Sequence, residues 1–181
     1  MNRLQIFLSL MLLVACGAST GKEQVSKAEK VQEKPVVVEP AVVVPIFDAD
    51  SAYSFIEAQV NFGPRVPSTV SHRRCGDYLV SKLESYGATV VTQDVDFKAY
   101  NGDILNARNI IAQFQPEKQQ RVMLCAHWDT RPWADSDPDK ANHYKPLPGA
   151  NDGGSGVGVL LEIARHLATV RSNVGVDIIL F

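Results

Sequence analysis

The residues best suited to chemistry lie in two short stretches of the C-terminal half of the sequence. The first, CAHWDTRPW at residues 125–133, places His127 and Asp129 two residues apart where an apolar run ends. The second, GANDGGSGVGV at residues 149–159, places Asp152 just before a glycine-rich helix start. Histidine nitrogen and carboxylate oxygen both bind zinc in proteins, so the two stretches can form a metal site if the fold brings them together.

The position of His127 at a predicted strand end favours a functional role. In open α/β sheets, ligand-binding crevices lie outside the carboxyl ends of the strands. A histidine in such a place is, on its own, more often an ordinary hydrogen-bonded residue than a metal ligand. Asp129 strengthens the metal hypothesis, because a carboxylate can hold the second ring nitrogen of a histidine that binds metal.

Asp152 has two possible roles that the sequence leaves open. Aspartate is a favoured N-cap residue, so Asp152 is suited to cap the helix that follows it. The start of a helix also stabilises an ionised carboxylate, which is the form that a zinc ligand needs. We expect the glycines that follow, at positions 153, 154, 156 and 158, to let this helix approach the sheet closely.

Two helices are predicted in the first part of the domain. Apolar residues recur at helical spacing after Asp50 or Ser51, either of which can serve as the N-cap of the first helix. The second helix is expected from about Ser71 to Tyr86, with Gly87 supplying the left-handed residue that ends it.

The pattern then changes to strands. Residues 88–97 and 107–114 predict a hairpin around the Asn101-Gly102 turn, and residues 121–126 predict a further strand. A helix over residues 154–168 and a buried strand over residues 175–181 follow. The succession of strand, helix and buried strand predicts a parallel pair within a mixed α/β sheet that carries helices on its faces.

The N-terminus has the features of a bacterial export signal. Arg3 precedes an apolar run over residues 4–14, which is too short to span a membrane. The residues from Leu13 to Cys16 resemble a lipobox, so we expect a signal peptide over residues 1–15 and a lipid on Cys16. Residues 16–45 then form a tether with a Pro/Val-rich spacer, and residues 46–181 form the domain. This organisation predicts a lipoprotein anchored to the bacterial cell envelope, at the periplasmic or outer-membrane face.

Charge and cysteine content limit the partners. Eighteen basic and twenty acidic residues give a formal net charge of -2, which offers no electrostatic surface for nucleic acid. We therefore expect no nucleic-acid partner. Cys75 and Cys125 remain besides Cys16, and they are either free buried thiols or a disulfide, depending on whether the fold brings them together.

Residues 48–181 resemble the N-terminal half of the zinc aminopeptidase-fold enzymes, metallopeptidase family 28. The resemblance rests on the His-x-Asp stretch, on GANDGGSG, and on the NFGPRVPST and NARNIIAQF stretches before them. The run AHWDTRPWADSDP is closer to the bacterial glutaminyl-peptide cyclotransferase (glutaminyl cyclase) branch. The resemblance implies a mixed, mainly parallel central sheet with helices on both faces.

The same resemblance implies a zinc-dependent enzyme that acts on peptides with free N-termini. The cyclotransferases convert an N-terminal glutamine to pyroglutamate and release ammonia. Asp152 matches a zinc ligand, His127 matches a ligand only where two zinc ions are bound, and Asp129 lies behind the histidine. Trp133 is expected either to line the substrate pocket or to pack the loop down.

The matching enzymes carry their remaining zinc ligands and their main catalytic acid/base beyond the point that matches Phe181. We therefore expect the sequence to be a C-terminally truncated part of such an enzyme, without activity on its own. Two alternatives remain open. One is a di-zinc aminopeptidase that hydrolyses N-terminal peptide bonds, and the other is a metal-free binding domain of the same fold.

Overall fold

The computed structural model describes residues 44–181, so the predicted signal peptide, Cys16 and nearly all of the tether lie outside the described residues. Within this part, none of the helices is both long enough and apolar enough to span a membrane. The elements follow in the order α1 (Ala49–Asn61), α2 (Val70–Ser85), β1 (Thr89–Lys98), β2 (Ile104–Phe114), β3 (Arg121–Ala126), the short 3-10 helix η1 (Lys140–Asn142), α3 (Gly154–Leu167) and β4 (Gly175–Leu180).

The strands form one mixed sheet in the order β1-β2-β4-β3. β3 and β4 are parallel, with Cys125 opposite Ile179, as the strand-helix-strand succession predicts. β1 pairs with β2, and β2 with β4, in antiparallel fashion. The mixed α/β fold is confirmed, but over the described residues the sheet is not mainly parallel. The short turn between β1 and β2 forces these two strands to pair antiparallel. β2, rather than another strand reached by a crossover, then lies beside β4.

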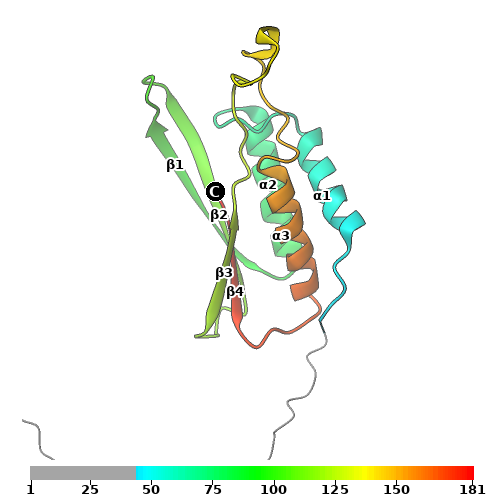
Figure 1. Cartoon of the computed structure of the whole chain (residues 1–181). Helices are drawn as coiled ribbons and strands as arrows, with labels where there is room; N and C mark the ends of the chain where they lie inside the picture. Colours follow the sequence, from blue (N-terminus) through cyan, green and yellow to red (C-terminus); the bar gives the residue numbers. More distant parts are fainter. Residues whose placement is uncertain (1–43) are drawn as a thin grey trace, which may run out of the picture. The chain divides into compact units, whose positions relative to one another are not determined.

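All three helices lie on the same side of the sheet (Figure 1). One core cluster joins them to alternate residues of the central strands; it includes Phe55 of α1, Leu79 of α2, Ile110 of β2, Leu161 of α3 and Ile178 of β4. Because side chains alternate along a strand, only one face of the sheet is packed in this way. The expectation of helices on both faces therefore does not hold for residues 44–181.

The opposite face of the sheet carries apolar side chains without a covering layer among the described residues. Val91, Ile111, Ile179 and Cys125 lie across from one another in register on the four strands. Val91 and Cys125 are exposed, and the two central isoleucines are half-buried. An apolar row of this kind is typical of a surface that another polypeptide segment covers.

The helix boundaries agree with the predictions to within a residue or two, except for the first N-cap. Asp48, rather than Asp50 or Ser51, caps α1, because its carboxylate accepts hydrogen bonds from the backbone N–H groups of Asp50 (3.0 Å) and Ser51 (3.1 Å). Thr69 caps α2 through the N–H of His72. Gly87 follows α2 with a φ of +86°, the left-handed conformation predicted for it.

Cys75 and Cys125 are both free, so the disulfide alternative is excluded. Cys75 lies fully buried on α2, and Cys125 is exposed on β3. Burial raises the pKa of the Cys75 thiol to about 12. Because the thiolate is the reactive form of cysteine, Cys75 is a packing residue.

Candidate metal centre

The structure brings His127, Asp129 and Asp152 together. The Nδ1 atom of His127 lies 3.1 Å from Oδ1 of Asp129, and its Nε2 atom lies 2.9 Å from Oδ1 of Asp152. The side chains of His127 and Asp129 are each 42% exposed and that of Asp152 is 64% exposed, so solvent and small ligands reach all three. The strand end and the helix start predicted from the sequence therefore meet at one exposed place.

The long loop between β3 and α3 folds back on itself to make this meeting possible. The Ala134 N–H donates to the carbonyl of Lys145 (2.9 Å), and the Leu147 N–H donates to that of Arg131 (3.2 Å). The loop thus leaves the sheet and returns beside it, and α3 then packs on β3 (Figure 1). This backbone pairing is what carries Asp152 back to the end of the strand that holds His127.

Asp152 does not cap α3. The N-cap residue is Gly153, which makes no side-chain capping bond, and the Asp152 carboxylate is turned toward His127 instead. Of the two roles that the sequence left open, the capping role is therefore wrong. The Asp152 carboxylate contributes its charge at a helix start, where an ionised carboxylate is stabilised.

The glycines of this stretch have different neighbours, and Gly154 faces the carbonyl of Gly149 rather than the sheet. A Cβ atom on Gly153, which has a φ of +87°, would lie 3.1 Å from Cε1 of His127, so the missing side chain leaves room for the imidazole ring. Gly156 faces Ala126 of β3, as expected for close approach to the sheet. Gly158 instead faces the backbone of Ala52 in α1, so its expected role against the sheet is wrong: it lets two helices pack closely.

The hydrogen-bond inventory of His127 restricts its chemistry. A neutral imidazole has one N–H donor and one acceptor, whereas a carboxylate only accepts. Both contacts of the ring are therefore hydrogen bonds only when both nitrogens carry hydrogen. With a metal ion at Nε2, the Nδ1–H group still donates to Asp129, and this fixes the tautomer that a ligating histidine needs.

The two tryptophans have different roles. Trp128 is fully buried; its ring stacks on His72 with 4.1 Å between centroids, and its Nε1–H donates to the carbonyl of Arg108 (3.1 Å). Burial lowers the pKa of His72. Trp133 is 43% exposed and lines a cavity of about 400 Å³ that Asp129 also lines. Trp128 therefore packs the loop down, and Trp133 is placed beside the site.

Arg65 belongs to the site although no sequence pattern assigned it a role. Its side chain is fully buried, and it donates hydrogen bonds to backbone carbonyls at both ends of the long loop. Burial lowers the pKa of its guanidinium, an effect that the negative charge of Asp129 opposes. The one signal in the sequence was the arginine between two prolines in NFGPRVPST. A charged side chain in such a loop would otherwise be expected to lie in solvent.

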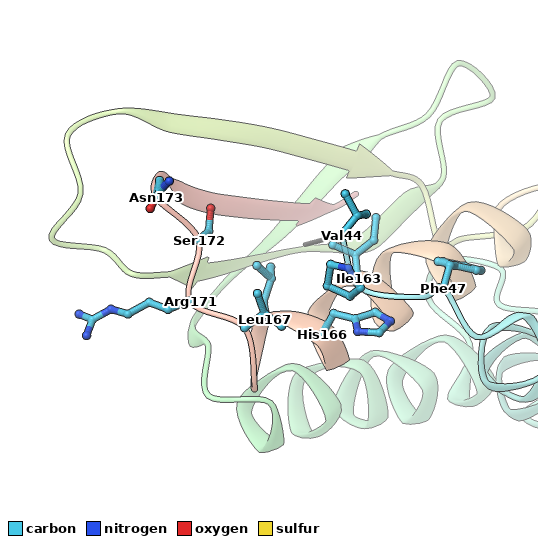
Figure 2. Close-up of a pocket in the computed structure, with 10 residues that line it drawn as sticks. Val44, Phe47, Ile163, His166, Leu167, Arg171, Ser172 and Asn173 are labelled. Carbon is cyan, nitrogen blue, oxygen red and sulfur yellow. The ribbon is translucent and has the colours of Figure 1, made fainter. Parts of the chain in front are cut away.

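A larger cavity lies elsewhere in the described residues. It measures about 600 Å³ and is lined mainly by the segment before α1, the last turns of α3 and the loop before β4, as Figure 2 shows. α3 begins beside Asp152 and ends at this cavity with Leu167, which at 1.5 Å per residue places the two about 20 Å apart. Phe47, Ile163 and Leu167 give it a largely apolar wall, and it contains none of the predicted site residues.

The donor set fits part of a zinc site. Two ligand atoms on one tetrahedral zinc ion lie about 3.4 Å apart, so the 2.9 Å between Nε2 of His127 and Oδ1 of Asp152 requires only a small side-chain rotation. Asp129 lies behind the histidine rather than beside this pair. Among residues 44–181, no three His, Cys, Asp or Glu side chains are grouped as a complete metal site requires.

Residues 109–181 match the family model of Peptidase family M28. This segment includes His127, Asp129 and Asp152, so all three candidate residues lie in the part of the chain that matches an enzyme family.

Solved structures extend the likeness beyond this segment. Over 76% of this chain, the crystal structure of glutaminyl cyclase from Tannerella forsythia is 58% identical, with a TM-score of 0.75. A Zn-dependent exopeptidase from Parabacteroides distasonis is 55% identical over 77% of this chain, with a TM-score of 0.76. The chain covers 47% and 48% of these two proteins, so it spans about half of their length.

A protein of Escherichia coli (strain K12), described as uncharacterized, is 29% identical over 119 residues, which are 65% of this chain and 34% of that protein.

The likeness to the solved structures shows that the mixed α/β fold is that of zinc aminopeptidase-like proteins. These relatives include both glutaminyl cyclases and zinc exopeptidases.

Proposed function

We propose, from the match of residues 109–181 to peptidase family M28, that the protein is a zinc-dependent glutaminyl-peptide cyclotransferase that forms pyroglutamate from an N-terminal glutamine. The observation that carries the proposal is the contact of 2.9 Å between Asp152 and His127, made by a carboxylate that does not cap its helix. The likeness to glutaminyl cyclases, at 58% identity, supports this choice of reaction.

Asp152 is the proposed zinc ligand. Its Oδ1 atom is directed at His127 and its side chain is 64% exposed, so the carboxylate is reachable by a metal ion. When both ring nitrogens carry hydrogen, His127 orients that carboxylate by donating from Nε2 and is itself held by Asp129 through Nδ1. Zinc, when bound, polarises the carbonyl group of the substrate that is attacked.

The substrate is proposed to be a peptide with a free N-terminus. Cyclisation forms a bond between the α-amine of the first residue and its own γ-carboxamide carbon and releases ammonia, so that residue has to fold back on itself while the rest of the peptide extends away. The cavity beside Asp129, with Trp133 in its wall, lies next to this point and has about 400 Å³ of space. We propose that Trp133 contacts the substrate there.

A di-zinc aminopeptidase is the second candidate. The contact between His127 Nδ1 and Asp129 favours it, because a carboxylate behind a histidine is the usual support of a histidine that binds metal. The likeness to a Zn-dependent exopeptidase, at 55% identity, is nearly as strong as that to the cyclase. In such an enzyme, zinc held in part by His127 and Asp152 would supply the activation of a water molecule for hydrolysis of the first peptide bond.

Zinc content and one substitution separate these functions. His127 and Asp152 alone are too few ligands to hold zinc tightly. Bound zinc is therefore counted in a protein that also carries the third ligand of a catalytic site. We expect about one zinc ion per chain for a cyclotransferase, two for an aminopeptidase and none for a metal-free binding domain. His127→Ala should leave the zinc count unchanged in the one-zinc enzyme and lower it in the two-zinc enzyme.

The control for that experiment is His143→Ala. His143 also contacts an acidic residue of the loop, through the carbonyl of Asp137 at 2.8 Å, but it takes no part in the site. Elemental analysis counts the metal, and mass spectrometry detects the loss of ammonia from a peptide that begins with glutamine. Two zinc ions with hydrolysis of the same peptide would replace the cyclotransferase proposal by the aminopeptidase.

We further propose that Cys16 anchors the protein to the cell envelope through a lipid. The basis is the lipobox-like stretch that ends at Cys16, after an apolar run too short to span the bilayer. Cys16→Ser should move the protein from the membrane fraction to the soluble fraction and abolish incorporation of labelled palmitate. Cys125→Ser, which removes an exposed free thiol, is the matched control. It should change neither the membrane fraction of the protein nor its incorporation of palmitate. Unchanged membrane retention of the Cys16 variant would refute the anchor.

A further inference from the structure

Arg65 is the most heavily bonded buried cation near the site. It lies in the turn between α1 and α2, and its side chain has no exposed surface. Its Nε donates to the carbonyl of Trp128 (3.0 Å), its Nη1 to that of Pro148 (2.9 Å), and its Nη2 to that of Gly149 (2.6 Å). A longer bond, of 3.4 Å, joins Nη1 to the carbonyl of Gln59 at the end of α1. All of these acceptors are backbone oxygens.

These bonds join the two segments that carry the candidate metal pair. Trp128 directly follows His127, and Gly149 lies three residues before Asp152. The backbone of Arg65 adds a further link, because its carbonyl accepts from the N–H of Thr130 (3.2 Å). One residue of the preceding turn therefore holds both the end of β3 and the last residues before α3.

The surroundings leave space for this side chain and for that of Thr130. A Cβ atom on Gly149, which has a φ of +65°, would clash with Cγ2 of Thr130 and would lie 2.8 Å from Nη2 of Arg65. The Gly149 carbonyl also accepts from the N–H of Gly154 (3.1 Å), so the guanidinium and the first turn of α3 share one acceptor. Any shift of Arg65 is therefore transmitted to the start of the helix that Asp152 precedes.

The chemistry of the contact requires arginine. Its guanidinium presents five N–H donors in a rigid planar fork, whereas lysine presents three on a single nitrogen. Burying a cation without a carboxylate partner carries a desolvation cost, which the carbonyl bonds offset only if their geometry is kept. If Arg65 only filled space, an apolar side chain would serve equally well, because its burial carries no such desolvation cost.

We infer that Arg65 is a positioning residue that fixes the separation of His127 and Asp152, so that the Asp152 carboxylate meets a metal ion without rearrangement of the loop. The inference deepens the proposed zinc-dependent function and rests on it for its consequence in metal binding. Its structural part, the holding of two segments by one guanidinium, is testable without metal.

Arg65→Lys is the first test, with Arg121→Lys as the matched control. Arg121 also donates to several backbone carbonyls, among them that of Gln115 at 2.7 Å, but it stands at the other end of β3 from His127. Zinc affinity is measured by competition with a chromophoric chelator, and the His127 ring is observed through its nitrogen-proton correlations in NMR spectra. Far-ultraviolet circular dichroism reports whether each variant is folded.

We expect Arg65→Lys to lower zinc affinity by about 10-fold to 100-fold, the usual effect of losing a group that orients a metal ligand. The His127 ring signals should shift in the same variant without metal. Arg121→Lys should leave both properties unchanged even if it lowers the melting temperature. Unchanged zinc affinity and ring signals in a folded Arg65→Lys protein would overturn the inference. If the unsubstituted protein, in a chain that also carries the third ligand, binds no zinc, the proposed function fails, and the ring signals still decide the role of Arg65.

A measurement on the unsubstituted protein covers the case in which the Arg65 variant does not fold. Hydrogen exchange is followed at the amides of Thr130 and Gly154, which are bonded to Arg65 and to its acceptor Gly149. If Arg65 holds both segments, the two amides open together and show the same protection within about threefold. A difference of more than about tenfold would show that the segments open independently and would overturn the inference.

Discussion

Asp152→Ala is expected to lower zinc affinity by more than about 100-fold and to abolish formation of pyroglutamate. The physical reason is that a catalytic zinc site has three protein ligands and leaves one position open, so the loss of one ligand leaves too few to hold the ion. Asp152→Asn should have nearly the same effect, because the amide keeps the shape of the side chain but lacks the negative charge that a zinc ligand supplies. Metal competition and mass spectrometry measure the two properties.

Protein stability distinguishes this role from that of a helix cap. Replacing a capping aspartate by alanine costs about 1 kcal/mol, whereas an exposed residue without such a role usually costs less than about 0.5 kcal/mol. Because Gly153 is the N-cap of α3, we expect the smaller value for Asp152→Ala. The control is Asp135→Ala, which removes an exposed carboxylate of the same loop that pairs with Arg131. Full zinc occupancy together with a loss of about 1 kcal/mol in the free energy of unfolding of Asp152→Ala would show that Asp152 acts as a helix cap and not as a zinc ligand.

Gly153→Ala is expected to disturb the site through the backbone. Gly153 has a φ of +87°, and a Cβ atom there would lie 3.0 Å from the Asp129 carbonyl oxygen and 3.1 Å from Cε1 of His127. Both distances are shorter than carbon normally allows, so the imidazole ring has to move away from its present contacts. Since His127 orients Asp152, we expect zinc affinity to fall by about 10-fold or more.

Gly87 provides a closely matched control for this substitution. It has almost the same φ, +86°, but a Cβ atom there would have no neighbour within 4 Å. Both alanine variants carry the strain of a left-handed residue, about 1–3 kcal/mol, which chemical denaturation measures. Only Gly153→Ala should also weaken zinc binding. Equal zinc affinities in the two variants would show that the contact with His127 has no part in metal binding.

The local elements of the fold could be predicted from the sequence, because short-range rules determine them. The period of the apolar residues and the left-handed residue Gly87 gave α2 its bounds to within a residue. The Asn101-Gly102 turn indicated the hairpin, and the strand-helix-strand succession indicated the parallel pairing of β3 with β4. His127, Asp129 and Asp152 were identified in the same way, from their places at a strand end and a helix start.

Only the tertiary structure decided how these elements are used. β2 pairs with β4 across more than sixty residues of chain, and this pairing makes most of the described sheet antiparallel. The rotation of Asp152 away from its helix, toward His127, depends on a loop that folds back through its own backbone bonds. Arg65 reaches Gly149 across 84 positions. Contacts of such separation depend on which buried polar groups find partners in three dimensions, and no local periodicity of the sequence encodes them.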